Sequence, residues 1–138
     1  MRNRRTAICL CNIAAALLAG ALFYIFFRKG TYLHSFLQIC FHTQPPFIRV
    51  DSPILTVICN HFGDFTWAYA LCCALLMIFA SGKYSAQLAV LSTTALGAGL
   101  ELLQRTKIVS GTFDIADILA ELSAALLAVI MIQRSSKK

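Results

Sequence analysis

The sequence predicts an all-α, polytopic membrane protein with four transmembrane helices and an interfacial or re-entrant loop between the first two. Of its 138 residues, 59% are hydrophobic and only 13% are charged, and the mean hydropathy is +0.74. A soluble domain carries roughly 25% charged residues, so this chain has too little polar surface to stay dissolved. Four apolar runs approach the roughly 20 residues that cross a bilayer. We expect one domain over 1–138.

The first predicted span, 7–27, follows a basic segment and ends before Arg28 and Lys29. A signal peptide also has a basic start, but its apolar region is only about 7–15 residues long. The apolar stretch here is longer and continues through Phe-Tyr-Ile-Phe-Phe, past any small-residue cleavage site. We therefore expect an uncleaved first span.

A long loop over 31–63 follows the first span. Its segment Tyr-Leu-His-Ser-Phe-Leu-Gln-Ile-Cys-Phe is apolar and aromatic enough to lie at the lipid–water interface. Ser52 and Pro53 then resemble an N-cap with proline at the first helical position, which predicts a short helix to about residue 60. A re-entrant hairpin is the alternative path for this loop.

Three further spans complete the predicted bundle. Asp64 is a possible N-cap of the second, and Gly97 and Gly99 within the third would let another helix backbone approach closely. The predicted spans are 65–80, 86–104 and 113–132.

The basic residues predict the orientation of the spans. With the N-terminus inside, seven bases face inward, namely Arg2, Arg4, Arg5, Lys83, Arg134, Lys137 and Lys138. Five face outward, namely Arg28, Lys29, Arg49, Arg105 and Lys107. Because cytoplasmic loops carry the excess of Lys and Arg, this predicts a cell-membrane protein with both termini cytoplasmic. The bases behind the net charge of +6 lie at the termini and in the loops, where they determine membrane topology. Because they form no basic stripe, no nucleic-acid partner is expected.

Polar residues cluster at the end of the third span and the start of the fourth. Glu101 and Gln104 are three residues apart and share a helix face, while Asp114, Asp117 and Glu121 form a stripe down the fourth helix. Ionisable groups at membrane depth are costly, so they are usually paired, hydrated or functional. Together with Asp64 and Arg105, these residues predict a ligand-binding site on the outer face: Asp64, Glu101, Gln104, Arg105, Asp114, Asp117 and Glu121.

A simpler interpretation explains some of these residues. Thr112 or Asp114 can cap the fourth helix, and Asp117 adds negative charge to its first turn. Arg105 can pair with Glu101 or mark the membrane boundary. Capping does not explain Glu101 or Glu121, because both lie inside apolar helices.

The spacing of histidine, acidic and cysteine residues indicates only a weak candidate for metal binding. His61 and Asp64 are three apart and would form a metal site with Glu101, although a histidine in an aromatic interface is commonly not a ligand. No tight metal motif, nucleophile elbow or P-loop is present in the sequence, so no cofactor and no catalytic residue are expected. None of the six cysteines forms a CxxC pair; Cys40 and Cys59 share one loop, and whether they form a disulfide is left open.

These motifs resemble the VanZ-like family of small integral membrane proteins. The resemblance lies in Glu101-Leu-Leu-Gln104, followed by a short loop and Asp114-Ile-Ala-Asp117-Ile-Leu, with an upstream Asp64-Phe-Thr-Trp. It covers about 64–138. Where the family usually has an asparagine, this chain has Glu121. Where glycines usually follow, it has Ser123, Ala124 and Ala125, which predicts looser helix contact.

The resemblance implies a cell-envelope protein acting near the outer leaflet, in a family associated with resistance to the glycopeptide antibiotic teicoplanin. We expect its acidic cluster to bind a polar headgroup or a lipid-linked cell-wall precursor, with the lipid bilayer and another membrane protein as further partners. Alternatives are a small ion- or proton-coupled carrier, a structural membrane subunit, and an intramembrane enzyme using paired carboxylates. The enzyme ranks below the carrier because no nucleophile is evident in the sequence.

Overall fold

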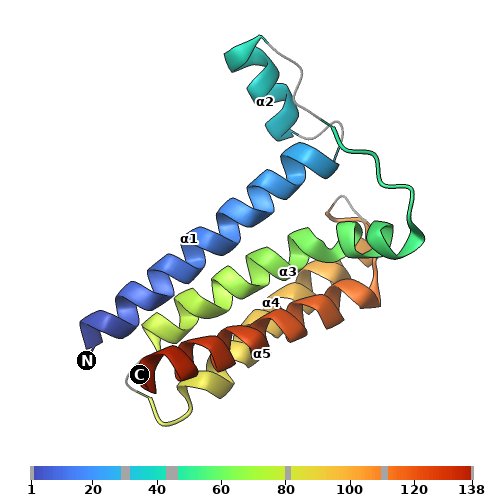
Figure 1. Ribbon diagram of the computed structural model, residues 1–138. Coiled ribbons are helices and arrows are strands. Elements are labelled where there is room, and N and C mark those ends of the chain that lie inside the picture. Colours follow the sequence, from blue (N-terminus) through green and yellow to red (C-terminus); the bar gives the residue numbers. More distant parts are fainter. Residues whose placement is uncertain (1, 29–31, 43–46, 80–81, 110–111, 138) are drawn as a thin grey trace.

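A computed structural model describes residues 2–28, 32–42, 47–79, 82–109 and 112–137 of the chain (Figure 1). All regular secondary structure in these ranges is helical, as predicted. The helices are α1 (Arg2–Phe27), α2 (Tyr32–Phe41), α3 (Pro53–Ile78), α4 (Ser85–Arg105) and α5 (Ile115–Lys137).

Four of these helices, α1, α3, α4 and α5, are long and apolar enough to cross a membrane, which indicates a multi-pass membrane protein. Figure 1 shows them side by side, with the N- and C-termini at the same end of the bundle. We call this the terminal end, and the opposite end, where α1 and α4 finish and α3 and α5 start, the loop end. The membrane type and the compartment that each end faces stay predictions.

Helix α3 is the centre of the bundle, since it packs against α1, α4 and α5. The core around it consists largely of small side chains, which let the helix backbones approach closely. These fully or almost fully buried residues are Cys9, Ala68, Cys72, Cys73, Leu76, Ala89, Ala124, Ala125, Ala128 and Ile132. Ala124 and Ala125 are both fully enclosed in this core, and the looser helix contact expected relative to glycine stays a prediction.

The path of α3 corrects the sequence prediction. The helix starts at Pro53 after Ser52, as predicted, but it continues through Asp64 to Ile78 without a break. The predicted short helix and second span are thus one element, and Asp64 is not an N-cap. No proline follows Pro53 in this helix, and the single Gly63 costs only about 1 kcal/mol relative to alanine, which is too little to end it. The predicted final residue of this span, residue 80, lies outside the described residues.

The length of α3 has a consequence for its position. Its 26 residues rise about 39 Å at 1.5 Å per residue, which exceeds the roughly 30 Å of bilayer hydrocarbon. Its first turns carry the exposed side chains Ile54, Leu55, Val57 and Ile58. The start of α3 therefore either tilts within the hydrocarbon or extends into the interface.

Helix α2 occupies the segment predicted to lie at the interface. Figure 1 shows it beyond the end of α1, projecting away from the four-helix bundle. It exposes the large apolar side chains Phe36, Ile39 and Phe41, as an interfacial helix would. All six cysteines are free thiols, so the Cys40–Cys59 disulfide considered from the sequence is not formed.

Candidate functional site

A polar cavity of about 610 Å³ lies at the loop end of the bundle. All four long helices or the segments next to them contribute to its wall. The lining residues are Tyr24, Arg28, Asn60, His61, Asp64, Glu101, Gln104, Thr112, Asp114 and Asp117. The volume lies within the roughly 300–1,000 Å³ of ligand sites, but such sites are usually mostly apolar. An all-polar lining favours a small polar or charged ligand.

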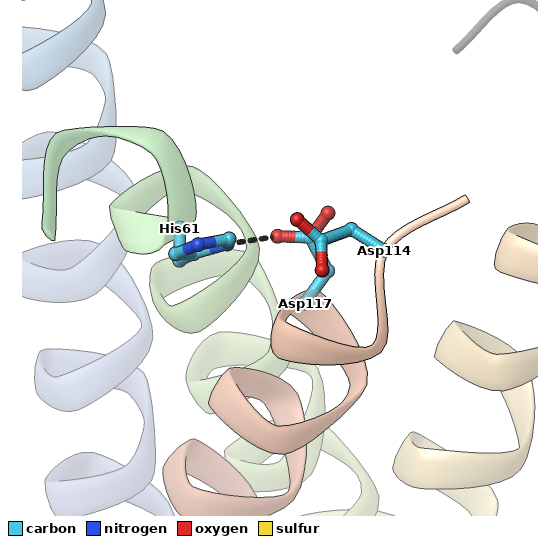
Figure 2. Close-up of side chains that lie close together, drawn as sticks. All are labelled: His61, Asp114 and Asp117. Atoms are coloured by element: carbon cyan, nitrogen blue, oxygen red, sulfur yellow. Dashed lines mark hydrogen bonds and ion pairs between the residues drawn. The ribbon is translucent and has the colours of Figure 1, made fainter. Parts of the chain in front are cut away.

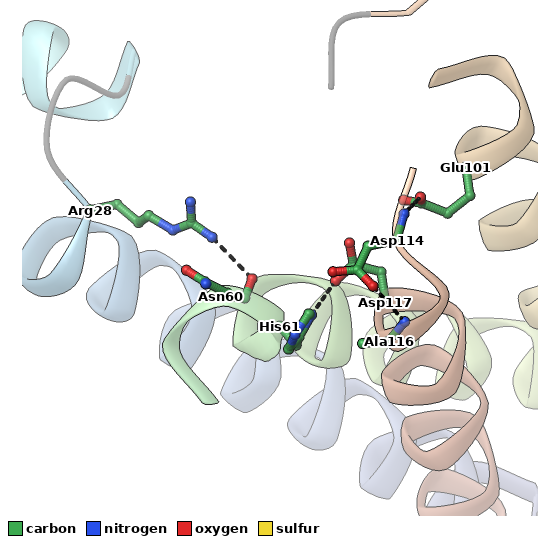
Figure 3. A network of polar contacts seen from close by, with 7 residues as sticks. All are labelled: Arg28, Asn60, His61, Glu101, Asp114, Ala116 and Asp117. Carbon is green, nitrogen blue, oxygen red and sulfur yellow. Dashed lines mark hydrogen bonds and ion pairs between the residues drawn. The ribbon is translucent and has the colours of Figure 1, made fainter. Parts of the chain in front are cut away.

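The start of α5 is held by two hydrogen bonds at Asp114. Asp114 Oδ1 accepts from the Ala116 backbone N–H at 2.8 Å, which confirms the predicted capping role. The Asp114 backbone N–H in turn donates to Glu101 Oε2, also at 2.8 Å. Because Glu101 is only 5% exposed, this bond satisfies a buried carboxylate and joins the end of α4 to the start of α5 (Figure 3).

Arg105 does not join this network. Its side chain is exposed, and its guanidinium carbon lies 5.6 Å from the centre of the Phe113 ring. Glu101 points to the α5 backbone, so the predicted Glu101–Arg105 pair is absent among the described residues. Arg105 also does not line the cavity. At the end of α4 it sits where an exposed base marks the membrane boundary.

His61 and Asp117 form the closest polar contact in the cavity. His61 Nδ1 and Asp117 Oδ1 share a hydrogen bond at 2.5 Å, and their side chains are 19% and 18% exposed (Figure 2). The Asp64 carboxyl also lines the cavity and lies near Asp117. Asp117 therefore has both a histidine and a second carboxyl on α3 as neighbours, in addition to its place in the first turn of α5.

Glu121 lies outside the cavity lining, behind its wall. It is 3% exposed, its closest charged neighbours are Asp64, Glu101 and Asp117, and its Oε2 has no hydrogen-bond partner among the described residues. A carboxyl oxygen without a partner in a low-dielectric interior is costly. The position of Glu121 thus requires a specific explanation.

Gly97 on α4 explains how Glu121 fits. A Cβ built on Gly97 would overlap Glu121 Oε2, so the missing side chain makes room for the carboxyl. Gly97 was predicted to admit a helix backbone, and in fact it admits a side chain from α5. Gly99 has nothing within 4 Å of the corresponding position, so the prediction that it mediates close approach is wrong.

The predicted site did not include four residues of the cavity wall, namely Tyr24, Arg28, Asn60 and Thr112. Arg28 was counted only as a topology marker, yet its Nη2 donates to the Asn60 carbonyl at 3.0 Å (Figure 3). Tyr24 lies one turn earlier in α1 and packs against Gly63, where a Cβ would approach its ring to 2.9 Å. The position of Arg28 at the same membrane boundary as the acids was a signal that could have placed it in the site.

The structure does not bring together the predicted metal ligands His61, Asp64 and Glu101, but a different group of three residues. The potential ligand atoms of His61, Asp114 and Asp117 lie within 4.8 Å of one another (Figure 2). Glu101 is instead bonded to the α5 backbone. A cation at the observed group would have to replace the His61–Asp117 hydrogen bond, so the arrangement as it stands is a hydrogen-bonded pair beside an N-cap.

Comparison of the chain with protein families, with curated proteins and with solved structures finds no match. The resemblance to VanZ-like proteins therefore stays a prediction, and functional inference depends on the cavity itself. Its wall carries four carboxyl groups, Asp64, Glu101, Asp114 and Asp117, against the single guanidinium of Arg28. This excess of negative charge favours a ligand that brings a positive group.

Proposed function

We propose that this protein is a VanZ-like membrane protein of the cell envelope that binds a positively charged or zwitterionic headgroup in the loop-end cavity. The observation that supports it most is the convergence of four carboxyls and one guanidinium from separate helices on one cavity of about 610 Å³. Such groups are rare at membrane depth unless they face a site or one another. The headgroup belongs to a bilayer lipid or to a lipid-linked cell-wall intermediate.

The hydrogen bond between Glu101 and the Asp114 backbone joins the two parts of the sequence that carry the family resemblance. The two halves of the resembling motif lie on α4 and α5, and this bond holds them together at the cavity. With both termini cytoplasmic, as the basic residues predict, the cavity would face the outer leaflet, where cell-wall precursors are exposed. A contribution to glycopeptide tolerance would follow from binding there.

Ligand binding by defined variants tests this proposal. We expect Asp117→Asn in the purified, detergent-solubilised protein to weaken binding of an ethanolamine headgroup at least tenfold, as measured by isothermal titration calorimetry. The matched control is Asp51→Asn, because Asp51 is an exposed carboxylate paired with Arg49 outside the cavity. Equal binding by the wild-type protein and both variants would contradict the proposal.

A second candidate function is cation- or proton-coupled transport, favoured by the buried, unpartnered carboxyl of Glu121. Deep carboxyls in transporters carry ions or protons, although transporters commonly have broken helices and inverted repeats. The test is flux in proteoliposomes, which Glu121→Gln should abolish while Asp51→Asn leaves it unchanged. Absence of flux in the wild-type protein would eliminate this candidate and leave headgroup binding.

A further inference from the structure

Two apolar depressions lie beside the polar cavity along α3. His61 lines the cavity and also the first depression, of about 310 Å³, which includes Phe62, Phe65 and Ala120. Phe62 and Phe65 also line the second depression, of about 300 Å³, which reaches Met131. Because each space shares lining residues with the next, the two depressions follow the cavity in succession, and we call the two depressions together the side groove.

The cavity has charge of opposite sign at its two sides. Figure 3 shows Arg28 and Asn60 at one side, with Asp114, Asp117 and Glu101 at the other and His61 between them. A ligand that matches this arrangement carries an anion toward Arg28 and a cation toward the α5 carboxyls. A guanidinium commonly binds phosphate, and carboxylates bind ammonium groups through charge-assisted hydrogen bonds.

Glu121 provides an independent reason to expect a positive group. Its side chain is only 3% exposed, and its unpartnered Oε2 lies against Gly97 behind the cavity wall. Asp64, Glu101 and Asp117 of that wall are close enough to interact with it electrostatically. Four neighbouring carboxyls in a low-dielectric region repel one another unless a cation or protons reduce their charge. A ligand ammonium beside Asp64 and Asp117 would reduce that repulsion directly.

We propose that the cavity and the side groove together bind one phospholipid with a phosphoethanolamine headgroup. The ammonium lies beside Asp64 and Asp117, the phosphate contacts Arg28, and one acyl chain follows Phe62 and Phe65 toward Met131. A primary ammonium is favoured over a quaternary one because it donates hydrogen bonds that carboxylate oxygens accept. This inference depends on the proposed function, since it names the ligand of the same cavity.

The test compares short-chain phosphatidylethanolamine, phosphatidylcholine and phosphatidylglycerol with identical acyl chains, added to the detergent-solubilised full-length protein. Trp67 is the single tryptophan and lies three residues after the cavity residue Asp64 on α3, so its fluorescence is the readout. We expect phosphatidylethanolamine to bind at least tenfold more tightly than the other two. Equal affinities would mean ordinary boundary lipid and would overturn the inference.

Two variants separate the headgroup site from the side groove. Arg28→Gln should weaken phosphatidylethanolamine binding about tenfold while leaving binding of free ethanolamine unchanged. Ala120→Phe should fill the groove and weaken binding of the lipid but not of free phosphoethanolamine. If free phosphoethanolamine binds as tightly as the lipid, the groove has no role and the inference is wrong.

The same experiment distinguishes the failure of the inference from the failure of the proposed function. Free ethanolamine binding that is lost in Asp117→Asn, without any preference among the three lipids, contradicts the lipid inference alone. No binding of ethanolamine, phosphoethanolamine or any of the lipids contradicts both. Asp51→Asn should match the wild type in every arm, which shows that a change in charge by itself is not responsible.

Discussion

The two ends of the bundle are built on different principles. At the terminal end, small side chains such as Cys9, Cys72 and Ala128 are completely enclosed. At the loop end, the same helices diverge around a cavity whose wall is polar, and their buried groups include Glu101 and Glu121. Close apolar packing therefore holds the helices together at one end, which allows the other end to keep its charged groups around an open space.

The difference shows that close helix packing and the polar cavity occupy separate regions of this fold. Small residues on α3 and α5 let the backbones approach, and this packing does not depend on the cavity. Each carboxyl at the loop end is instead placed by its own contact. A backbone amide binds Glu101, His61 binds Asp117, and the missing side chain of Gly97 leaves space for Glu121. Substitutions at the two ends should therefore have different consequences.

The largest effect on stability is expected from adding side-chain volume to the closely packed core of the terminal end. Ala125→Leu places three extra carbon atoms where the alanine is 0% exposed, and such overpacking costs about 1–3 kcal/mol or more. The free energy of unfolding, measured by denaturant titration in detergent, should fall by about 3 kcal/mol. Thr112→Leu at the cavity wall is the matched control and should change it by less than about 0.5 kcal/mol. Equal losses would show that the loop end is as closely packed as the terminal end.

The next effect concerns the contact between Gly97 and Glu121. Gly97→Ala should force the Glu121 carboxyl out of its position and destabilise the protein by about 2 kcal/mol. In a Glu121→Ala background the same change should cost little, since the overlapping carboxyl is gone. A double-mutant cycle should therefore give a coupling energy of about 1 kcal/mol or more. Additive effects would mean that the two residues do not share this space.

A smaller effect is expected at the start of α5. Asp114→Ala removes the cap on the Ala116 N–H and should lower the free energy of unfolding by about 1 kcal/mol. Asp114→Asn should preserve stability, because asparagine caps a helix about as well. The pair of variants also separates capping from charge: if Asp114→Asn weakens headgroup binding without loss of stability, the carboxylate acts on the ligand.

The smallest effect is expected from the hydrogen bond between α1 and α3. Tyr69 Oη donates to Asn12 Oδ1 at 2.7 Å, and interhelical bonds of this kind contribute about 0.6 kcal/mol on average in membrane proteins. Tyr69→Phe should lower the free energy of unfolding by about that amount. Tyr84→Phe, at an exposed position, is the control and should have no effect.

The sequence was informative where the physical signal is local. Apolar runs predicted four long helices, the Ser52-Pro53 pair predicted the start of α3, and spacing predicted the cap at Asp114. Asp64 was misinterpreted because an aspartate before an apolar run also resembles an N-cap, and no local feature distinguishes that from an acid inside a continuous helix.

Contacts between helices could not be predicted in the same way. Arg28 and Asn60 meet because of how α1 and α3 are rotated about their axes, which residue spacing within either helix does not determine. The partner of Gly97 was likewise unpredictable, since a glycine can admit a backbone or a side chain and only the packing of α4 on α5 decides which.

Because α3 runs without a break from Pro53 to Ile78, its two ends move together as one rigid element. Its outer turns, beginning at Pro53, are rigidly joined to the segment that carries His61 and Asp64. A bilayer that thickens or thins changes the tilt of a helix longer than its hydrocarbon layer, and α3 has no hinge to absorb that rotation. A change in that tilt would therefore move His61 and Asp64 together with the start of the helix.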